Sequence, residues 1–164
     1  MNFRCCVCGE FFDLHRSASR IADRQFPMQC SIGCLKKHIR IWKFPKINTG
    51  ELLTSPDWKI VPKPAHMYSR HMRSEYEYAF ANFFKTHNIE YRYEPFAIRL
   101  ENGDRYVPDF YLPEYWTLVE CKGTWGMGAK KKFKRVLLEV PSLIIVQSYL
   151  CDKIVRLYGD KIIK

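Results

Sequence analysis

The sequence contains no apolar stretch that approaches the length needed to cross a membrane. Its longest aliphatic run, Leu143–Val146, suits a short buried strand. There is no internal repeat and no low-complexity tract, so the sequence does not indicate a repeat protein or a compositionally biased tail. Met1–Cys8 is polar and cysteine-rich where a signal peptide needs an apolar core, so we expect an intracellular protein that is neither secreted nor membrane-bound.

Acidic residues are scarce in the first part of the chain. Residues 1–50 hold nine lysines and arginines but three acids, and the formal charge of the whole chain is +10. Such an excess is typical of a segment that binds nucleic-acid phosphates. A second basic cluster follows residue 129 and either steers a nucleic-acid backbone or forms a solvated helix face. The candidate DNA-binding residues are Arg16, Arg20, Arg24, Lys36, Lys37, Arg40, Lys130, Lys131 and Lys132.

Val107–Gly123 carries the most informative pattern. Asp109 follows a proline at an expected strand end, and Glu120 and Lys122 lie in the next apolar segment. Because strand side chains alternate, Glu120 and Lys122 project from one face and their neighbours from the other. Two carboxylates and a lysine are a set that holds a divalent cation and activates water against a phosphodiester. The alternative is a turn-capping Asp109 and an exposed ion pair between Glu120 and Lys122.

The elements expected around this pattern are helices and strands of an α/β protein. Ser74 is a candidate N-cap with Glu77 at the third helical position, which is a capping-box pattern. Asn102-Gly103 marks a hairpin turn between two strand-like runs. The expected strands are Glu90–Leu100, Asp104–Leu112, Trp116–Lys122 and Leu143–Gln147, with Lys153–Leu157 as a further candidate, and a helix is expected over Ala129–Val140.

Pro108, Asp109, Glu120 and Lys122, in this order of elements, resemble the PD-(D/E)XK nuclease superfamily over about residues 69–164. The resemblance implies a restriction-endonuclease-like α/β core, in which helices flank a mixed central sheet in the order α-β-β-β-α-β. It also implies an Mg²⁺-dependent endonuclease.

In this family, Asp109, Glu120 and the main-chain carbonyl of Cys121 would bind Mg²⁺, and Lys122 would orient or deprotonate the attacking water. The family often adds a glutamate from the first helix, and an R-S-x-x-E arrangement selects Glu77, with Glu75 as the competing candidate.

The cysteines near the N-terminus have metal-ligand spacing. Cys5 and Cys8 form a C-x-x-C pair, and Cys30 and Cys34 form a C-x-x-x-C pair ahead of an expected helix over Leu35–Ile41. Four thiolates are a common structural Zn²⁺ set. The arrangement resembles a treble-clef zinc finger of phage and mobile-element nucleases. Cys6 could replace Cys5, and His38 could replace a cysteine. Disulfides and buried free thiols are the alternatives, and Cys121 and Cys151 are expected to be inert thiols outside the cluster.

These features predict a zinc-finger module over residues 1–42, an extended linker over 43–68 and a nuclease domain over 69–164. The expected activity is metal-dependent endonucleolytic cleavage of double-stranded or branched DNA, either site-specific or structure-specific, with the finger adding affinity or specificity. A homodimer is the expectation from the family. The alternatives are a non-catalytic DNA-binding protein on a nuclease scaffold, a Holliday-junction resolvase and an RNA-processing nuclease.

Overall fold

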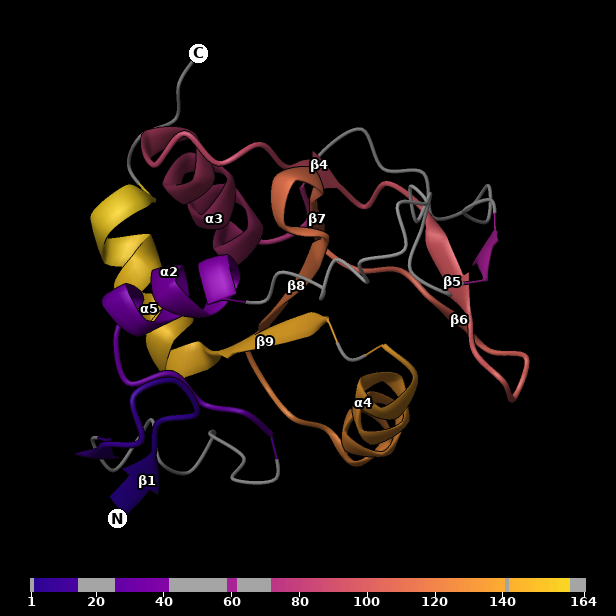
Figure 1. Ribbon diagram of the computed structural model, residues 1–164, viewed down its shortest axis with the longest axis horizontal. Coiled ribbons are helices and arrows are strands. Elements are labelled where there is room, and N and C mark those ends of the chain that lie inside the picture. Colours follow the sequence, from indigo (N-terminus) through magenta and orange to yellow (C-terminus); the bar gives the residue numbers. More distant parts are fainter. Residues whose placement is uncertain (1, 15–25, 42–58, 62–71, 141, 160–164) are drawn as a thin grey trace, which may run out of the picture.

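The computed structural model describes residues 2–14, 26–41, 59–61, 72–140 and 142–159 (Figure 1). At its centre is a four-stranded sheet in the order β4-β7-β8-β9. Helices α3 and α5 cover one face of this sheet, and α4 covers the other (Figure 1). The bounds of these elements are β4 Arg92–Tyr93, β7 Phe110–Leu112, β8 Thr117–Lys122, β9 Leu143–Gln147, α3 Glu75–Thr86, α4 Met127–Glu139 and α5 Ser148–Tyr158.

The central sheet is mixed. Strand β8 pairs antiparallel with β7 and parallel with β9, and α4 makes the crossover that a parallel pair requires. Along β9 the side chains alternate between the two cores, because Ile144 and Val146 pack with α3 and α5 while Leu143 and Ile145 pack with α4. The expected α/β class with a mixed sheet is confirmed. Its identity as a restriction-endonuclease core stays a prediction.

A smaller sheet lies beside the central one, in the order β3-β5-β6 (β3 Ile60–Val61, β5 Ala97–Arg99, β6 Arg105–Tyr106). The hairpin between β5 and β6 turns where the sequence predicted it, with Gly103 at a φ of 86°. Glycine adopts this left-handed conformation without steric cost.

Two of the expected strands are each broken in the middle. Residues 90–100 form β4 and β5 in different sheets, separated by residues 94–96, which include Pro95. Residues 104–112 form β6 and β7 on either side of Pro108. Proline has no N–H for the ladder, so a strand changes sheets readily at such a position. Five strands therefore lie between α3 and α4, where the sequence predicted three.

The candidate strand Lys153–Leu157 is wrong, because these residues belong to α5. Leu150 and Ile154, four positions apart, are both fully buried against the sheet and α3. This spacing is helical, but the short apolar run over Lys153–Leu157 was interpreted as a strand. The helix expected over Ala129–Val140 spans Met127–Glu139.

The cysteine-rich segment consists of the hairpin β1 (Asn2–Arg4) and β2 (Phe11–Asp13) followed by α2 (Ile32–Ile41). Its side chains Phe3, Met28, Leu35 and Ile39 are buried in the same core as α3 and α5. The Tyr149 hydroxyl on α5 donates a hydrogen bond to the Gln29 carbonyl at 2.6 Å. This segment therefore packs directly on the α/β core. The predicted module boundaries at 42/43 and 68/69, and most of the expected linker, lie outside the described residues.

Candidate active site and metal centre

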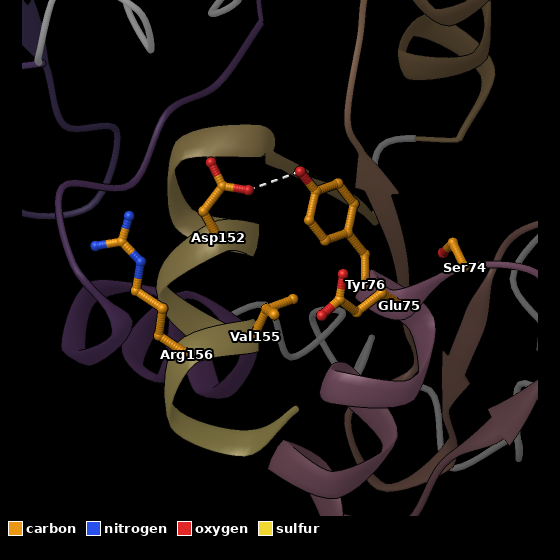
Figure 2. Close-up of a pocket in the computed structure, with 6 residues that line it drawn as sticks. All are labelled: Ser74, Glu75, Tyr76, Asp152, Val155 and Arg156. Atoms are coloured by element: carbon orange, nitrogen blue, oxygen red, sulfur yellow. Dashed lines mark hydrogen bonds between the residues drawn. The ribbon is translucent and has the colours of Figure 1, made fainter. Parts of the chain in front are cut away.

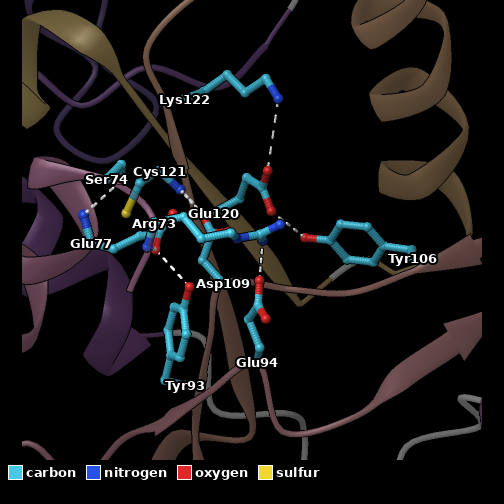
Figure 3. Close-up of polar contacts among 10 residues, drawn as sticks. All are labelled: Arg73, Ser74, Glu77, Tyr93, Glu94, Tyr106, Asp109, Glu120, Cys121 and Lys122. Atoms are coloured by element: carbon cyan, nitrogen blue, oxygen red, sulfur yellow. Dashed lines mark hydrogen bonds and ion pairs between the residues drawn. The ribbon is translucent and has the colours of Figure 1, made fainter. Parts of the chain in front are cut away.

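Asp109, the residue just before β7, lies opposite Glu120 on β8. Phe110 pairs with Val119, and the same register continued by one residue places Asp109 against Glu120. Each residue is only 8% exposed. The Cys121 N–H donates to Asp109 Oδ2 at 2.7 Å. The structure thus brings together the two carboxylates that the sequence singled out (Figure 3).

Lys122 completes the predicted set. Its Nζ lies 3.8 Å from Glu120 Oε1, and its side chain is 20% exposed. On the other side, the Tyr106 hydroxyl donates to Glu120 Oε2 at 3.0 Å. Glu120 is therefore held between a cation and a hydroxyl group, so its carboxylate has a fixed orientation (Figure 3). Sequence reasoning did not identify Tyr106, because this residue has the pattern of an ordinary core aromatic.

Of the two helix glutamates, Glu77 faces this cluster. It is buried, and its carboxylate accepts hydrogen bonds from the Arg73 N–H and the Tyr93 hydroxyl, both at 2.6 Å. The predicted N-cap is confirmed, because Ser74 Oγ accepts from the Glu77 N–H at 3.2 Å. The Glu77 carboxylate accepts from the N–H of the residue before the cap, and its bond from Tyr93 on β4 directs it toward the strands.

Glu75 lies elsewhere. It is exposed and lines a separate pocket of about 460 Å³ between α3 and α5, together with Tyr76 and Asp152 (Figure 2). The Tyr76 hydroxyl donates to Asp152 Oδ1 at 2.6 Å on the wall of this pocket. The geometry therefore favours Glu77 over Glu75 as the helix residue of the site.

Sequence reasoning missed a fourth acid, Glu94. It is 4% exposed, has a φ of 39°, and donates its N–H to the Asp109 carbonyl at 2.9 Å. Its carboxylate pairs with the Arg73 guanidinium (Figure 3). The one available signal was the Glu94-Pro95 break inside an expected strand, which brings the acid to the end of β4.

Burial changes the ionisation of the two central carboxyl groups. It raises the pKa of Asp109 to about 7, and the negative charge of Glu77 acts in the same direction. Burial and the charge of Asp109 raise the pKa of Glu120 to about 8, against the opposing effect of Lys122. Near neutral pH these groups hold protons that a divalent cation would displace. Their hard oxygen donors suit Mg²⁺.

The N-terminal cysteines converge as predicted. The sulfur atoms of Cys5, Cys8, Cys30 and Cys34 all lie within 4.8 Å of one another. Cys30 Sγ is 3.7 Å from Cys8 Sγ and 3.5 Å from Cys34 Sγ. Sulfur atoms around a tetrahedral zinc at ~2.3 Å would be about 3.8 Å apart. Within the described residues, this is the one group of three or more His, Cys, Asp or Glu side chains whose ligand atoms lie close enough to share a metal ion.

Position favours Cys5 over the two alternative ligands, Cys6 and His38. Cys5 belongs to the cluster, and Cys6 does not. Cys6 Sγ instead lies 3.9 Å from His38 Nδ1, and Gln29 Nε2 contacts that nitrogen at 3.2 Å. His38 is thus held outside the cluster, and burial lowers its pKa to about 4.

Hydrogen bonds prepare Cys5 for a cation. Burial opposes ionisation, but the backbone N–H groups of Cys8, Cys30 and Val7 lower the pKa of Cys5 to about 6. The Val7 and Cys30 N–H groups each lie 3.4 Å from its sulfur. Burial raises the pKa of Cys30 to about 12, and it also raises that of Cys34. Ionisation of Cys30 and Cys34 therefore requires a positive charge nearby.

The candidate DNA-binding residues lie on two helices where the structure describes them. Lys37 and Arg40 are exposed on α2 and Lys36 is half-buried, whereas Lys131 and Lys132 are exposed and Lys130 is half-buried on α4. The charge of Lys132 also lowers the pKa of Glu120, so α4 directs a cation toward the carboxylates. Arg16, Arg20 and Arg24 lie outside the described residues.

We found no match to this chain among protein-family models, curated proteins or solved structures. Across the described segments, none of the helices has both the length and the apolar character needed to cross a membrane.

We expect the stability that Asp109 and Glu120 contribute to the zinc-loaded protein to fall as the pH rises from about 5 to 8 in the absence of Mg²⁺. Because their pKa values are raised in the folded chain, these two groups bind more protons there than in the unfolded chain over this range, so rising pH reduces their contribution. Asp109→Asn should flatten this decline in thermal unfolding without added divalent cations, and Glu75→Gln, at an exposed acid, should not. An equally steep decline in Asp109→Asn and the wild type would show that the pKa of Asp109 is not raised in the folded protein.

We expect Cys8→Ser to lose the bound metal and Cys6→Ser to keep it. Both are exposed cysteines of one turn, but Cys8 belongs to the four-sulfur cluster and Cys6 does not. Elemental analysis of the purified proteins should give one zinc per wild-type or Cys6→Ser chain and much less for Cys8→Ser. Equal zinc content in the two variants would refute the ligand set.

Proposed function

We propose that this protein is a metal-dependent DNA endonuclease that hydrolyses phosphodiester bonds. The observation that carries the proposal is the placement of buried Asp109 opposite Glu120, with Lys122 at 3.8 Å from Glu120. An ion pair on an exposed strand would not require two nearly buried carboxylates that disfavour each other's charge. A site for a divalent cation explains why they are kept together.

The residues that would hold Mg²⁺ are Asp109, Glu120 and the main-chain carbonyl of Cys121. When bound, Mg²⁺ supplies positive charge that offsets the charge developing on the phosphate. Tyr106 and the Cys121 N–H already fix one oxygen of each carboxylate, so little rearrangement is needed for the remaining oxygens to act as ligands.

Lys122 is the residue that acts on water in this proposal. Its ammonium group lies beside Glu120 and is partly exposed, so it can reach both a water molecule and a phosphate oxygen. It orients the water for in-line attack and holds charge on the phosphate as the leaving oxygen departs. Glu77 supports the site from α3, where Tyr93 and the Arg73 N–H keep its carboxylate in place.

The four cysteines would bind one structural Zn²⁺. The sulfur spacing and the N–H groups directed at Cys5 fit that ion. It would join the β1–β2 hairpin to the start of α2 and so hold in place a segment with few aliphatic residues of its own.

DNA is the proposed substrate because exposed cations lie on several elements of the protein. Besides α2 and α4, the outer face of the β3-β5-β6 sheet carries a row of cations. Arg99 pairs with Arg105, and the Arg99 N–H donates to the Lys59 carbonyl at 2.9 Å, so the three exposed side chains adjoin. Like charges directly opposite each other destabilise a sheet, which favours a role in binding phosphates.

The proposal is tested with supercoiled plasmid and a four-way junction, each incubated with Mg²⁺ or with EDTA. We expect metal-dependent cutting by the wild type that falls at least about a thousandfold in Asp109→Ala, Glu120→Ala and Lys122→Ala. Glu75→Ala is the control and should cut normally, and Glu77→Ala should lose more activity than Glu75→Ala. Cutting by Asp109→Ala at the wild-type rate would refute the site, and preference for plasmid or junction separates the two substrate classes.

The cation row predicts a specific salt dependence of DNA binding. Changing Lys59, Arg99 and Arg105 together to Gln should weaken binding and lower the slope of log K against log salt by up to ~0.9 for each lost phosphate contact. The matched control changes Lys153, Arg92 and Arg156, which are exposed elsewhere, to Gln. An equal fall in slope for both triple variants would show that the row has no special part in binding.

A further inference from the structure

The cysteine-rich segment contacts the loop that follows the Lys122 strand. The Phe26 ring stacks on the Trp125 ring with 3.9 Å between centroids and 5° between planes. Phe26 is 3% exposed and belongs to the core beneath α4. Trp125 comes three residues after Lys122. Two parts of the chain far apart in sequence thus meet beside the proposed site.

The segment that begins at Phe26 packs on both faces of the central sheet. Met28, two residues later, is buried in the opposite core with α3 and α5. The Met28 carbonyl accepts the Cys6 N–H at 2.8 Å, and Cys30 is one of the four clustered cysteines. The short run from Phe26 to Cys30 therefore contributes to the two cores on opposite faces of the central sheet, and one of its ends lies in the cysteine cluster.

Trp125 is fixed on its other sides as well. Its Nε1 donates to Gln147 Oε1 at 3.2 Å, and Gln147 pairs with Lys122 in the parallel register of β8 and β9. The edge of Trp125 meets the Phe133 ring at 87° with 5.8 Å between centroids. Phe26 covers the face, so the orientation of the indole depends on it.

Lys122 Nζ lies against this aromatic group. It is 4.4 Å from the Phe133 centroid and 5.9 Å from the Trp125 centroid. Rings at these distances attract an ammonium group, while Glu120 Oε1 attracts it from the other direction at 3.8 Å. A lysine on a flexible four-carbon stem is thereby restricted to one region.

We propose that Phe26 is a positioning residue for Lys122, so that the cysteine-rich segment sets the geometry of the catalytic strand's lysine. Phe26 holds Trp125, and Trp125 with Phe133 holds the ammonium group toward Glu120. The role of Lys122 in cleavage rests on the proposed function, whereas its placement by Phe26 does not. The segment then affects the chemical step in addition to any DNA affinity that it supplies.

The kinetic test compares Phe26→Leu, Phe26→Tyr and Phe3→Leu in Mg²⁺-dependent plasmid nicking. Phe26→Leu keeps apolar volume but removes the flat ring, so kcat should fall roughly tenfold to a hundredfold with KM within about twofold. Phe26→Tyr restores a ring and should recover most of kcat. Phe3→Leu makes the same change in the same segment, but in the other core, and should leave kcat near wild type.

A second measurement is independent of activity. Ring currents from Phe133 and Trp125 should shift the side-chain methylene NMR signals of Lys122 upfield in ¹³C-lysine-labelled protein, with the signals identified by their loss in Lys122→Arg. The shift should shrink in Phe26→Leu and persist in Phe26→Tyr and Phe3→Leu.

An unchanged shift or an unchanged kcat in Phe26→Leu would overturn the inference, as would an equal loss of kcat in Phe3→Leu. A wild-type protein that cuts no DNA but shows the predicted NMR changes would refute the proposed function and leave the placement of Lys122 by Phe26 supported.

Discussion

The burial of several carboxyl groups in one place is the constraint on which the rest of the structure depends. Glu77, Glu94, Asp109 and Glu120 are each less than a tenth exposed. Such groups are costly to bury unless they are paired, hydrogen-bonded or protonated, and all three remedies occur here. Arg73 pairs with Glu94, hydroxyl and N–H donors reach the other three, and the pKa values of Asp109 and Glu120 rise. A divalent cation would replace the protons as the means of compensation.

The cysteine cluster also brings together partly buried groups that are costly to ionise. Its four thiols crowd together, and burial raises the pKa values of Cys30 and Cys34, so they too need a cation to ionise fully. Side-chain packing connects the cysteine cluster with the carboxylates, because the residues just before Cys30 are buried in the cores on both faces of the sheet. Metal binding at the cysteines would therefore stabilise the packing beside Lys122.

The parts of the site that were predictable follow from local periodicity. Alternation along one strand placed Glu120 beside Lys122, a cap pattern directed Glu77 inward, and ligand spacing identified the four cysteines. The parts that were missed depend on tertiary packing. Glu94 enters the site only because Pro95 interrupts its strand, and Phe26 reaches Trp125 only because its segment wraps the sheet edge. A short apolar run also led to a strand prediction over Lys153–Leu157, which belong to helix α5. No pattern along the sequence records such encounters between distant residues.

Calorimetric titration of the zinc-loaded protein with Mn²⁺, in two buffers of different ionisation enthalpy at pH 7, tests the central claim most directly. Mn²⁺ accepts the same oxygen ligands as Mg²⁺. The account predicts one site per chain whose occupation releases protons from Asp109 and Glu120, and predicts that Asp109→Asn abolishes the proton release and weakens binding. Absence of a binding site, or binding that is identical in Asp109→Asn, would contradict the assignment of these carboxylates to a metal.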